Sequence, residues 1–459
     1  MLTGRLFDTK TGLPEDRQPF SDNALKAMIV PLMIEQLLQL IVGVADTLMV
    51  SYTGEAIVSG VSLDTMLYRF FMLLFSAVAT GGSVIISQYI GSRRKRDAEK
   101  AAAQVFLLGA VFSAAAMAFV FLFGNAVLLA LYRDVDPQVM NACRDYLRIV
   151  TFSFPACATY NAGAALYRSM GKTRVTMTVS VIMNVANAAG NAVGIFALRA
   201  GVAGVAWPTV ISWYVAAAMM TARCLRENND VQLHIRDILH LNGTVSGSIL
   251  RVALPNAAEN MLFQGAKIAL GAFVATFGTI QIAANGVAQT LWSLGACIHV
   301  AMCPVYITVI GQCAGAKDME AAAWYMKKLT RLTLVLAIGW SIICTLIALP
   351  LLPLYAVSEE TRRLIWIAVL IHNSFSAFVE PFTMPLASGL RATGDIRFTF
   401  WSSVFCTVFF RTAMAYLLGS RLGMGIIGVT WAMVMDWCLK AALDIMRFRS
   451  NRWSAHQLI

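Results

Sequence analysis

Long apolar stretches alternate with short polar segments along almost the whole chain. Each apolar stretch has roughly 20 residues or more, the length that an α-helix needs to cross the hydrocarbon core of a bilayer. The pattern predicts twelve membrane spans, at residues 25–50, 60–89, 98–122, 138–162, 175–197, 203–222, 249–275, 281–313, 327–349, 361–387, 397–419 and 425–446. We therefore expect an all-α polytopic membrane protein that is surrounded by a lipid bilayer.

The composition agrees with this pattern. Of the 459 residues, 58% are hydrophobic and only 13% are charged, whereas soluble domains carry about 25% charged residues. The opening segment is polar and of mixed charge, so it does not resemble a cleavable signal peptide. We expect it to form a cytoplasmic tail.

Lysine and arginine are divided unevenly between the two sides that the twelve spans define. The tails and the loops on their side hold 25 of the 36 basic residues, and the loops on the opposite side hold five. This asymmetry is the positive-inside pattern, which predicts that both termini lie in the cytoplasm and that the protein spans a plasma (inner) membrane. Because orientation accounts for the net charge of +11, we expect no nucleic-acid partner.

The two halves of the sequence repeat each other. When the sequence is shifted onto itself by 224, the motif "GVAGVAW" (201–207) falls on "GIIGVTW" (425–431), and a shift of 223 superposes "RSMGKTR" on "RATGDIR". The shift of 224 also superposes identical single residues: Pro31 on Pro255, Glu35 on Glu259, and Gly54 on Gly278. Six spans fall in each half. An even number returns the chain to its starting side, so two six-helix lobes are predicted as parallel repeats about a pseudo-two-fold axis.

The repeat and the polar segments together predict five parts of one chain, which we expect to act as a monomer. They are an N-terminal cytoplasmic tail (1–24), an N-lobe (25–222), a cytoplasmic linker (223–248), a C-lobe (249–446) and a C-terminal cytoplasmic tail (447–459). Two lobes of this kind are expected of a secondary transporter.

Enzyme and metal motifs do not occur in the sequence. The nine cysteines form no CxxC pair, which argues against a zinc site or a disulfide framework. The sequence also contains no HExxH motif, no GxSxG motif and no histidine cluster. We therefore expect no enzymatic activity, no bound metal and no cofactor.

One carboxylate, Asp46, lies inside the apolar run "LIVGVADTLMV". Ionisable groups within membrane spans are costly and tend to face a cavity or a polar partner, so Asp46 is a candidate functional group. The fifth span contains "NVANAAGN", whose amides Asn184, Asn187 and Asn191 share one helical face. The alternative for these amides is hydrogen bonding between helices, which we favour for Asn184.

Several motifs, in this order along the chain, resemble the MATE (multidrug and toxic compound extrusion) family. They are a proline that opens the first span, an Asp fifteen residues later followed by "TLMV", then "QYIG", "LRATGD" and "RFRSNRW". The resemblance covers essentially the whole chain. It implies an antiporter that exports amphipathic, often cationic small organic compounds in exchange for protons or sodium ions, by alternating access.

The resemblance also assigns candidate residues in the N-lobe. Asp46 stands where the family has its cation-coupling carboxylate, Asn187 and Asn191 match the family's Asn-x3-Asn/Asp pair, and Thr209 lies at the family's spacing on the next span. Some archaeal members have a second Asp where this chain has Asn191. Carboxylate, amide and hydroxyl oxygens suit a small hard cation, and a carboxyl group can equally take up and release a proton, so both coupling ions stay open.

Buried charges of the C-lobe form a second candidate group. Glu380, eleven residues before Arg391, matches a carboxylate of the norfloxacin-exporter branch of the family. That branch has a further Glu where this chain has Phe263, whereas Glu259 lies four residues past Pro255 and Lys267 lies two turns beyond it. Either Lys267 neutralises Glu380 or Glu259 across a cavity, or these charges form a static ion pair that fixes helix packing.

Three functions compete at this point. Cation-coupled export of small organic compounds is the first, flipping of a lipid-linked sugar precursor is the second, and intramembrane catalysis is a distant third. A flippase is expected to line its cavity with several arginines for phosphate groups, whereas the candidate cavity charges here are few and mainly acidic. Export is therefore the favoured hypothesis. The lone histidines His299 and His372 are interpreted as hydrogen-bonded structural groups.

Overall fold

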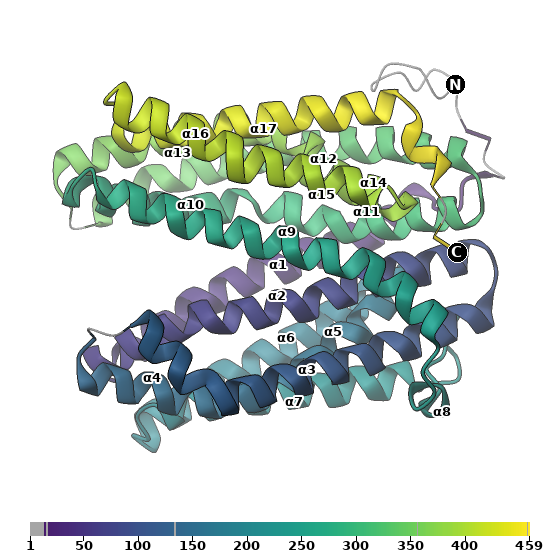
Figure 1. Cartoon of the computed structure of the whole chain (residues 1–459), viewed down its shortest axis with the longest axis horizontal. Helices are drawn as coiled ribbons and strands as arrows, with labels where there is room; N and C mark the ends of the chain where they lie inside the picture. The colour runs from purple at the N-terminus through teal and green to yellow at the C-terminus, as the bar shows by residue number, and fades with distance from the viewer. Residues whose placement is uncertain (1–12, 15–16, 133–134, 356, 457) are drawn as a thin grey trace. The chain divides into compact units, whose positions relative to one another are not determined.

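The computed structural model describes residues 13–14, 17–132, 135–355, 357–456 and 458–459, and Figure 1 shows the path of the chain. Helices account for most of these residues, among which no β-strand occurs. The first seven helices are α1 (Asp22–Ser51), α2 (Glu55–Gly91), α3 (Lys95–Leu131), α4 (Pro137–Val150), α5 (Phe154–Ser169), α6 (Thr173–Ala192) and α7 (Ala203–Cys224). The others are α8 (Ile235–Ile238), α9 (Gly243–Ala275), α10 (Thr279–Gly295), α11 (Cys297–Gly315), α12 (Met319–Leu351), α13 (Glu359–Val379), α14 (Met384–Thr393), α15 (Ile396–Val404), α16 (Arg411–Ala415) and α17 (Gly425–Arg449).

Several of the predicted spans consist of two helices joined end to end. A 3-10 turn at Thr151–Ser153 joins α4 to α5, and another at Glu380–Phe382 joins α13 to α14. Pro155 and Pro381 lie at or beside these turns. Proline lacks a backbone N–H and clashes with the preceding turn, which explains both breaks. Turns of π-helix occur at residues 193–197, 405–410 and 416–421.

Ten helical segments of the described chain are long and apolar enough to cross a membrane. They are α1, α2, α3, α6 with its π-turn, α7, α11, α12, α13 with α14, residues Ile396–Arg421, and α17. The segments α4–α5 and α9 complete the twelve helical segments that the apolar pattern predicts. Three charged residues, Arg144, Asp145 and Arg148, make α4 the more polar part of the α4–α5 segment. The prediction of an all-α polytopic membrane protein is confirmed.

The chain divides into two compact units. One unit comprises residues 26–257, and the other comprises residues 258–459 together with the described residues before Lys26. We call them the N-unit and the C-unit. The boundary near residue 257 lies inside α9, so the polar segment after α7 belongs to the N-unit.

The N-unit is a helical bundle around α2 and α5. Helix α2 packs against α3, α4 and α5, while α7 packs against α5 and α6 (Figure 1). Its core includes Phe75, Leu128, Cys143 and Phe154, all nearly inaccessible to solvent. Burying such side chains stabilises the fold by about 1.5–3 kcal/mol each in a soluble protein, and in a membrane close packing between helices takes over this role.

Small residues permit the closest helix contacts. A Cβ atom on Gly194 would lie 2.2 Å from the carbonyl oxygen of Gly204, and one on Gly428 would lie 2.6 Å from the carbonyl carbon of Leu418. Gly204 and Gly428 are equivalent positions of the sequence repeat. Both units therefore use the same glycine to bring two helical backbones together.

The C-unit follows the same plan and also holds the chain's first described residues. Helix α11 packs against α12 and α14, and α13 packs against α10, α12 and α17. The Tyr325 hydroxyl on α12 donates a hydrogen bond to the Phe20 carbonyl at 2.7 Å. The Arg17 guanidinium pairs with Asp318 at 2.6 Å and with Glu320 at 3.0 Å. Part of the expected N-terminal tail is thus attached to the beginning of α12.

One buried ion pair occurs in both units at the same place in the repeat. Arg168 at the end of α5 pairs with Glu35 on α1 at 2.7 Å, and Arg391 at the end of α14 pairs with Glu259 on α9 at 2.8 Å. The Thr176 hydroxyl adds a hydrogen bond to Glu35 at 3.3 Å. These pairs join the first and fourth helical segments of each half, so the sequence repeat is also a repeat of tertiary contacts.

Candidate functional site

Three helices of the N-unit bring four predicted site residues together. Asp46 lies on α1, and the Asn191 amide on α6 donates a hydrogen bond to its Oδ1 atom at 3.0 Å. Asn187 lies one turn before Asn191, and its amide is 3.2 Å from the Thr209 hydroxyl on α7. Both asparagines are buried, whereas Asp46 and Thr209 are partly accessible. We call Asp46, Asn187, Asn191 and Thr209 the N-unit polar cluster.

The neighbours of Asn187 determine how its amide is oriented. With the nitrogen directed at Asp46, it lies 3.0 Å from Oδ2 and 3.2 Å from Oδ1, and the amide oxygen accepts a hydrogen bond from Thr209. The opposite orientation would direct the amide oxygen at the carboxylate, and two acceptors would then face each other. We therefore assign the orientation in which Asn187 donates to Asp46.

The charged form of Asp46 is well satisfied by this arrangement. Two amide groups donate to its carboxylate oxygens, and hydrogen bonds to an ionised acceptor are among the stronger ones. A hard metal cation would instead need several oxygen ligands directed at one point. The described residues contain no group of three or more Asp, Glu, His or Cys side chains placed to hold a metal ion. The Asp46 carboxylate is thus held between α1 and α6 by amide donors.

Asn184 lies outside the N-unit polar cluster. Its amide donates a hydrogen bond to the Ser180 hydroxyl at 3.4 Å, one turn earlier on α6. This hydrogen bond stays within one helix, so it differs from the bond between helices that we favoured for Asn184 from the sequence. Asn184 therefore provides a natural comparison for the two amides that contact Asp46.

In the C-unit, Glu380 is paired with a residue that sequence reasoning had interpreted as structural. The Glu380 carboxylate lies 2.9 Å from His299 Nδ1, although the two groups are not aligned for a hydrogen bond. Both side chains are buried. Glu380 owes its position to the 3-10 turn after α13, and His299 lies on α11. His372, stacked on Trp292, lies within electrostatic range of Glu380.

Glu259 is held by partners other than the one proposed from the sequence. Its carboxylate pairs with Arg391 at 2.8 Å, and Lys440 lies 3.7 Å from its other oxygen. Lys267, further along α9, is exposed. In the described chain Glu259 therefore pairs with Arg391 and Lys440, while Glu380 pairs with His299.

Sequence reasoning missed one buried ion pair of the C-unit. Arg411 on α16 donates to Asp436 on α17 at 2.9 Å and 2.5 Å, and both side chains are buried. In the repeat, Arg411 is equivalent to Asn187 and Asp436 is equivalent to Ser212. The repeat register could therefore have revealed that a polar contact between α6 and α7 is replaced in the C-unit by an ion pair.

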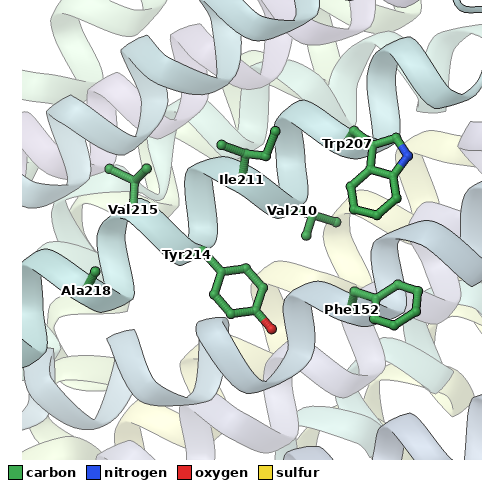
Figure 2. Close-up of a pocket in the computed structure, with 7 residues that line it drawn as sticks. All are labelled: Phe152, Trp207, Val210, Ile211, Tyr214, Val215 and Ala218. Atoms are coloured by element: carbon green, nitrogen blue, oxygen red, sulfur yellow. The ribbon is translucent and has the colours of Figure 1, made fainter.

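An apolar hollow lies along α7 and the 3-10 turn between α4 and α5. Figure 2 shows the aromatic and aliphatic side chains that line it: Phe152, Trp207, Val210, Ile211, Tyr214, Val215 and Ala218. No charged side chain lines this hollow, so it differs in character from the cluster around Asp46.

Comparison with known proteins gives the identity of the fold. The MatE family model matches the chain twice, at residues 31–193 and at residues 255–417. The chain belongs to the MatE family. The two matched segments are offset from each other by the same shift that relates the two halves of the sequence. The resemblance to MATE transporters is therefore confirmed over both halves of the chain.

Curated relatives of this MatE protein match it over nearly its whole length. An uncharacterized transporter, YisQ of Bacillus subtilis, is 27% identical over 94% of each chain. The probable multidrug resistance protein NorM of Thermotoga maritima is 22% identical over 98% of this chain and 97% of its own. A NorM of Halalkalibacterium halodurans is 24% identical over 90% of this chain and 93% of its own. One of these relatives is thus described as a transporter and the other two as probable multidrug resistance proteins.

Solved structures show that the MatE fold itself is shared. A MOP superfamily transporter from Pyrococcus furiosus has a TM-score of 0.85 at 20% identity, and the match covers 93% of this chain and 95% of that one. A MATE structure in a bent conformation has a TM-score of 0.84 at 19% identity, covering 94% and 97%. These identities are low, so the likeness concerns the path of the chain.

Proposed function

We propose that this protein is a secondary active antiporter that exports amphipathic, cationic small organic compounds in exchange for protons. Membership of a transporter family supports the general class. The observation that carries the coupling proposal is the Asp46 carboxylate, whose oxygens accept hydrogen bonds from Asn191 and Asn187 and which is partly accessible. Sodium is the other candidate ion, and the test below separates the two.

The polar cluster links protonation to helix contacts. The ionised Asp46 accepts hydrogen bonds that join α1 to α6. When Asp46 takes up a proton, it loses its negative charge and one oxygen becomes a donor, so an amide N–H directed at that oxygen loses its acceptor. The contact between the two helices is then weaker. Protonation can bias alternating conformations only if they differ in their affinity for the proton, and this change in hydrogen bonding supplies such a difference.

Glu380 supplies the proposed preference for cationic compounds. It is a buried acidic group beside His299, and an attraction between opposite charges is strong where the local dielectric constant is low. A cationic compound would be attracted to this carboxylate, whereas a neutral one would not. Glu259 is already engaged by Arg391 and Lys440, so we assign it a structural role.

We propose that both termini lie in the cytoplasm of a plasma-membrane protein. An even number of helical segments supports both ends lying on one side, and the excess of Lys and Arg in the tails and their adjoining loops supports the cytoplasmic side. Fusion of a reporter that is active on only one side of the membrane to the C-terminus tests this orientation. Activity of a periplasmic reporter at that end would contradict it.

Dye efflux from proteoliposomes tests the coupling. Purified protein is reconstituted, a cationic dye is added, and a proton gradient or a sodium gradient is imposed separately. We expect efflux with the proton gradient alone. Efflux driven only by sodium would replace the proton in the proposal, and efflux that neither gradient accelerates would contradict antiport.

A further inference from the structure

A second carboxyl group of the N-unit, Asp64 on α2, is more deeply buried than Asp46. Its exposed fraction is 0%. The Cys143 thiol on α4 donates to Asp64 Oδ1 at 3.1 Å, while Oδ2 has no hydrogen-bond partner among the described residues. Cys143 itself belongs to an apolar core that includes Phe75 and Phe154. An unpaired charge in such surroundings is costly, so the neutral acid is favoured there.

The side chains around Asp64 do not neutralise it. From α4 the Cys143 thiol donates to it, and Tyr146 shares a core cluster with Val61, one turn before Asp64. From the end of α3 it faces Tyr132, whose hydroxyl donates to the carbonyl of the neighbouring Leu63 at 3.3 Å. Arg144 follows Cys143 on α4, but the ion pairs of the described residues do not include an Arg144–Asp64 pair.

Helices α3 and α5 also pack against α2, and the ion pairs of the described residues include none between Asp64 and either helix. Tyr68, one turn further along α2, shares a hydrogen bond with Ser153 and packs against the same core cluster as Cys143. The surroundings of Asp64 thus consist of thiol, phenol and apolar groups. With no metal ion or cationic side chain beside it, such a carboxyl group loses its negative charge only by binding a proton.

Tyr146 connects Asp64 with the N-unit polar cluster. It is buried and belongs to one core cluster with Val61, one turn before Asp64, and Val205, one turn before Thr209. Asp46, Asp64, Tyr146 and Thr209 also lie at a similar distance from the ends of their helices. With a rise of about 1.5 Å per residue, each lies roughly 8–14 Å from the end of its helix on the side of the α1–α2 loop. A change of charge at one carboxyl group therefore affects the other through Tyr146.

The fold itself does not require an acid at this position. The repeat places Ala288 of α10 where the N-unit has Asp64, and Ala288 is equally buried. A small apolar residue therefore fits the same place in the helix bundle. Asp64 costs more to bury than alanine, and this points to a function that the C-unit lacks.

We propose that Asp64 is a second proton-binding site of the N-unit, linked to Asp46 through Tyr146. In the binding step one proton from solution forms an O–H bond with a carboxylate oxygen of Asp64, and no other bond changes. The role of this proton in transport rests on the proposed antiport, whereas its binding does not. The two can therefore fail separately.

Infrared difference spectroscopy of the reconstituted full-length protein tests the binding directly. A neutral carboxylic acid has a C=O stretching band that a carboxylate lacks, and we expect one such band to titrate with pH and to be absent in Asp64→Asn. The matched control is Asp145→Asn, an exposed acid on α4, which should keep the band. A spectrum of Asp64→Asn that titrates like the wild type would overturn the proposal.

The link to Asp46 is tested with two further variants. We expect the Asp64 band to shift in Asp46→Asn, because the neighbouring charge changes, and we expect this shift to disappear when Tyr146→Phe is added. Cys143→Ala covers the case in which Asp64→Asn does not fold. It removes the thiol donor and should shift the same band, and an unchanged band in Cys143→Ala would assign it to another group and contradict the proposal.

Discussion

Asn191 on α6 donates a hydrogen bond to Asp46 on α1 across 3.0 Å. This contact joins two helices through a charged acceptor, and Asn187 supports it from one turn earlier. Charge-assisted hydrogen bonds depend strongly on the protonation of the acceptor. The position of α1 relative to α6 is thus sensitive to one proton, and the first prediction follows from this.

We expect Asp46→Asn to abolish gradient-driven export while leaving folding and membrane insertion intact. The amide is nearly isosteric with the carboxylate and costs less to bury, but it cannot bind and release a proton. Dye efflux under an imposed proton gradient and the yield of folded protein measure the two effects. Asn184→Ala, which loses an amide that bonds within its own helix, serves as the control and should keep transport. Wild-type pumping by Asp46→Asn would leave Asp46 as a packing residue.

Glu380→Gln should impair the export of cationic compounds more than that of neutral ones. The substitution removes the negative charge beside His299 but keeps the size of the side chain. Its effect is measured as the ratio of initial efflux rates for a cationic and a neutral dye of similar shape. Glu259→Gln is the matched comparison, because Glu259 is already paired with Arg391 and Lys440. An equal loss for both dyes in Glu380→Gln would indicate a structural role.

Removing one partner of the buried Glu35–Arg168 ion pair should destabilise the protein more than removing both partners. Removing one partner leaves an uncompensated buried charge, which costs about 3–5 kcal/mol. We therefore expect Glu35→Gln to lower the melting temperature in detergent more than the double variant Glu35→Gln with Arg168→Met does. If the loss in the double variant equals the sum of the losses in Glu35→Gln and Arg168→Met, the two groups are not coupled.

The pH dependence of Asp318 can be predicted because this residue lies at the beginning of α12, outside the span. Burial raises the pKa of Asp318, but hydrogen bonds from Arg17 and from the Ala321 backbone outweigh it and hold the pKa below its usual value. A depressed pKa means that the stabilisation is complete above the ordinary Asp value of about 4. It is lost as the pH falls through the lower pKa of the folded protein.

Thermal unfolding against pH tests this prediction. Asp318→Asn keeps the helix cap, since asparagine caps helices as well as aspartate does, but it loses the charge that pairs with Arg17. We expect the variant to melt at a slightly lower temperature than the wild type near neutral pH, with the difference shrinking as the pH is lowered below about 4. The effect is small because the pair is partly exposed. A difference that does not change with pH would contradict it.

The apolar pattern by itself determined the helical spans and the repeat. In a bilayer every backbone N–H and C=O must be satisfied within the protein, so a run of roughly 20 apolar residues can only be a helix. The spacing of Asn187 and Asn191 also determined that these amides lie on one face of α6. Asp46 was also recognisable from the sequence, because an ionisable group inside an apolar span is costly and usually marks a functional site.

The partners of the buried charges were decided only by the tertiary structure. Sequence reasoning could place Glu259 and Lys267 on one helix, but Glu259 pairs with Arg391, 132 residues away. In the same way it could not pair Glu380 with His299, or Asp64 with Cys143. Periodicity gives the face of a residue within its own helix. The rotation and depth of the neighbouring helix, which decide what that face meets, depend on the packing of all the helices in the unit.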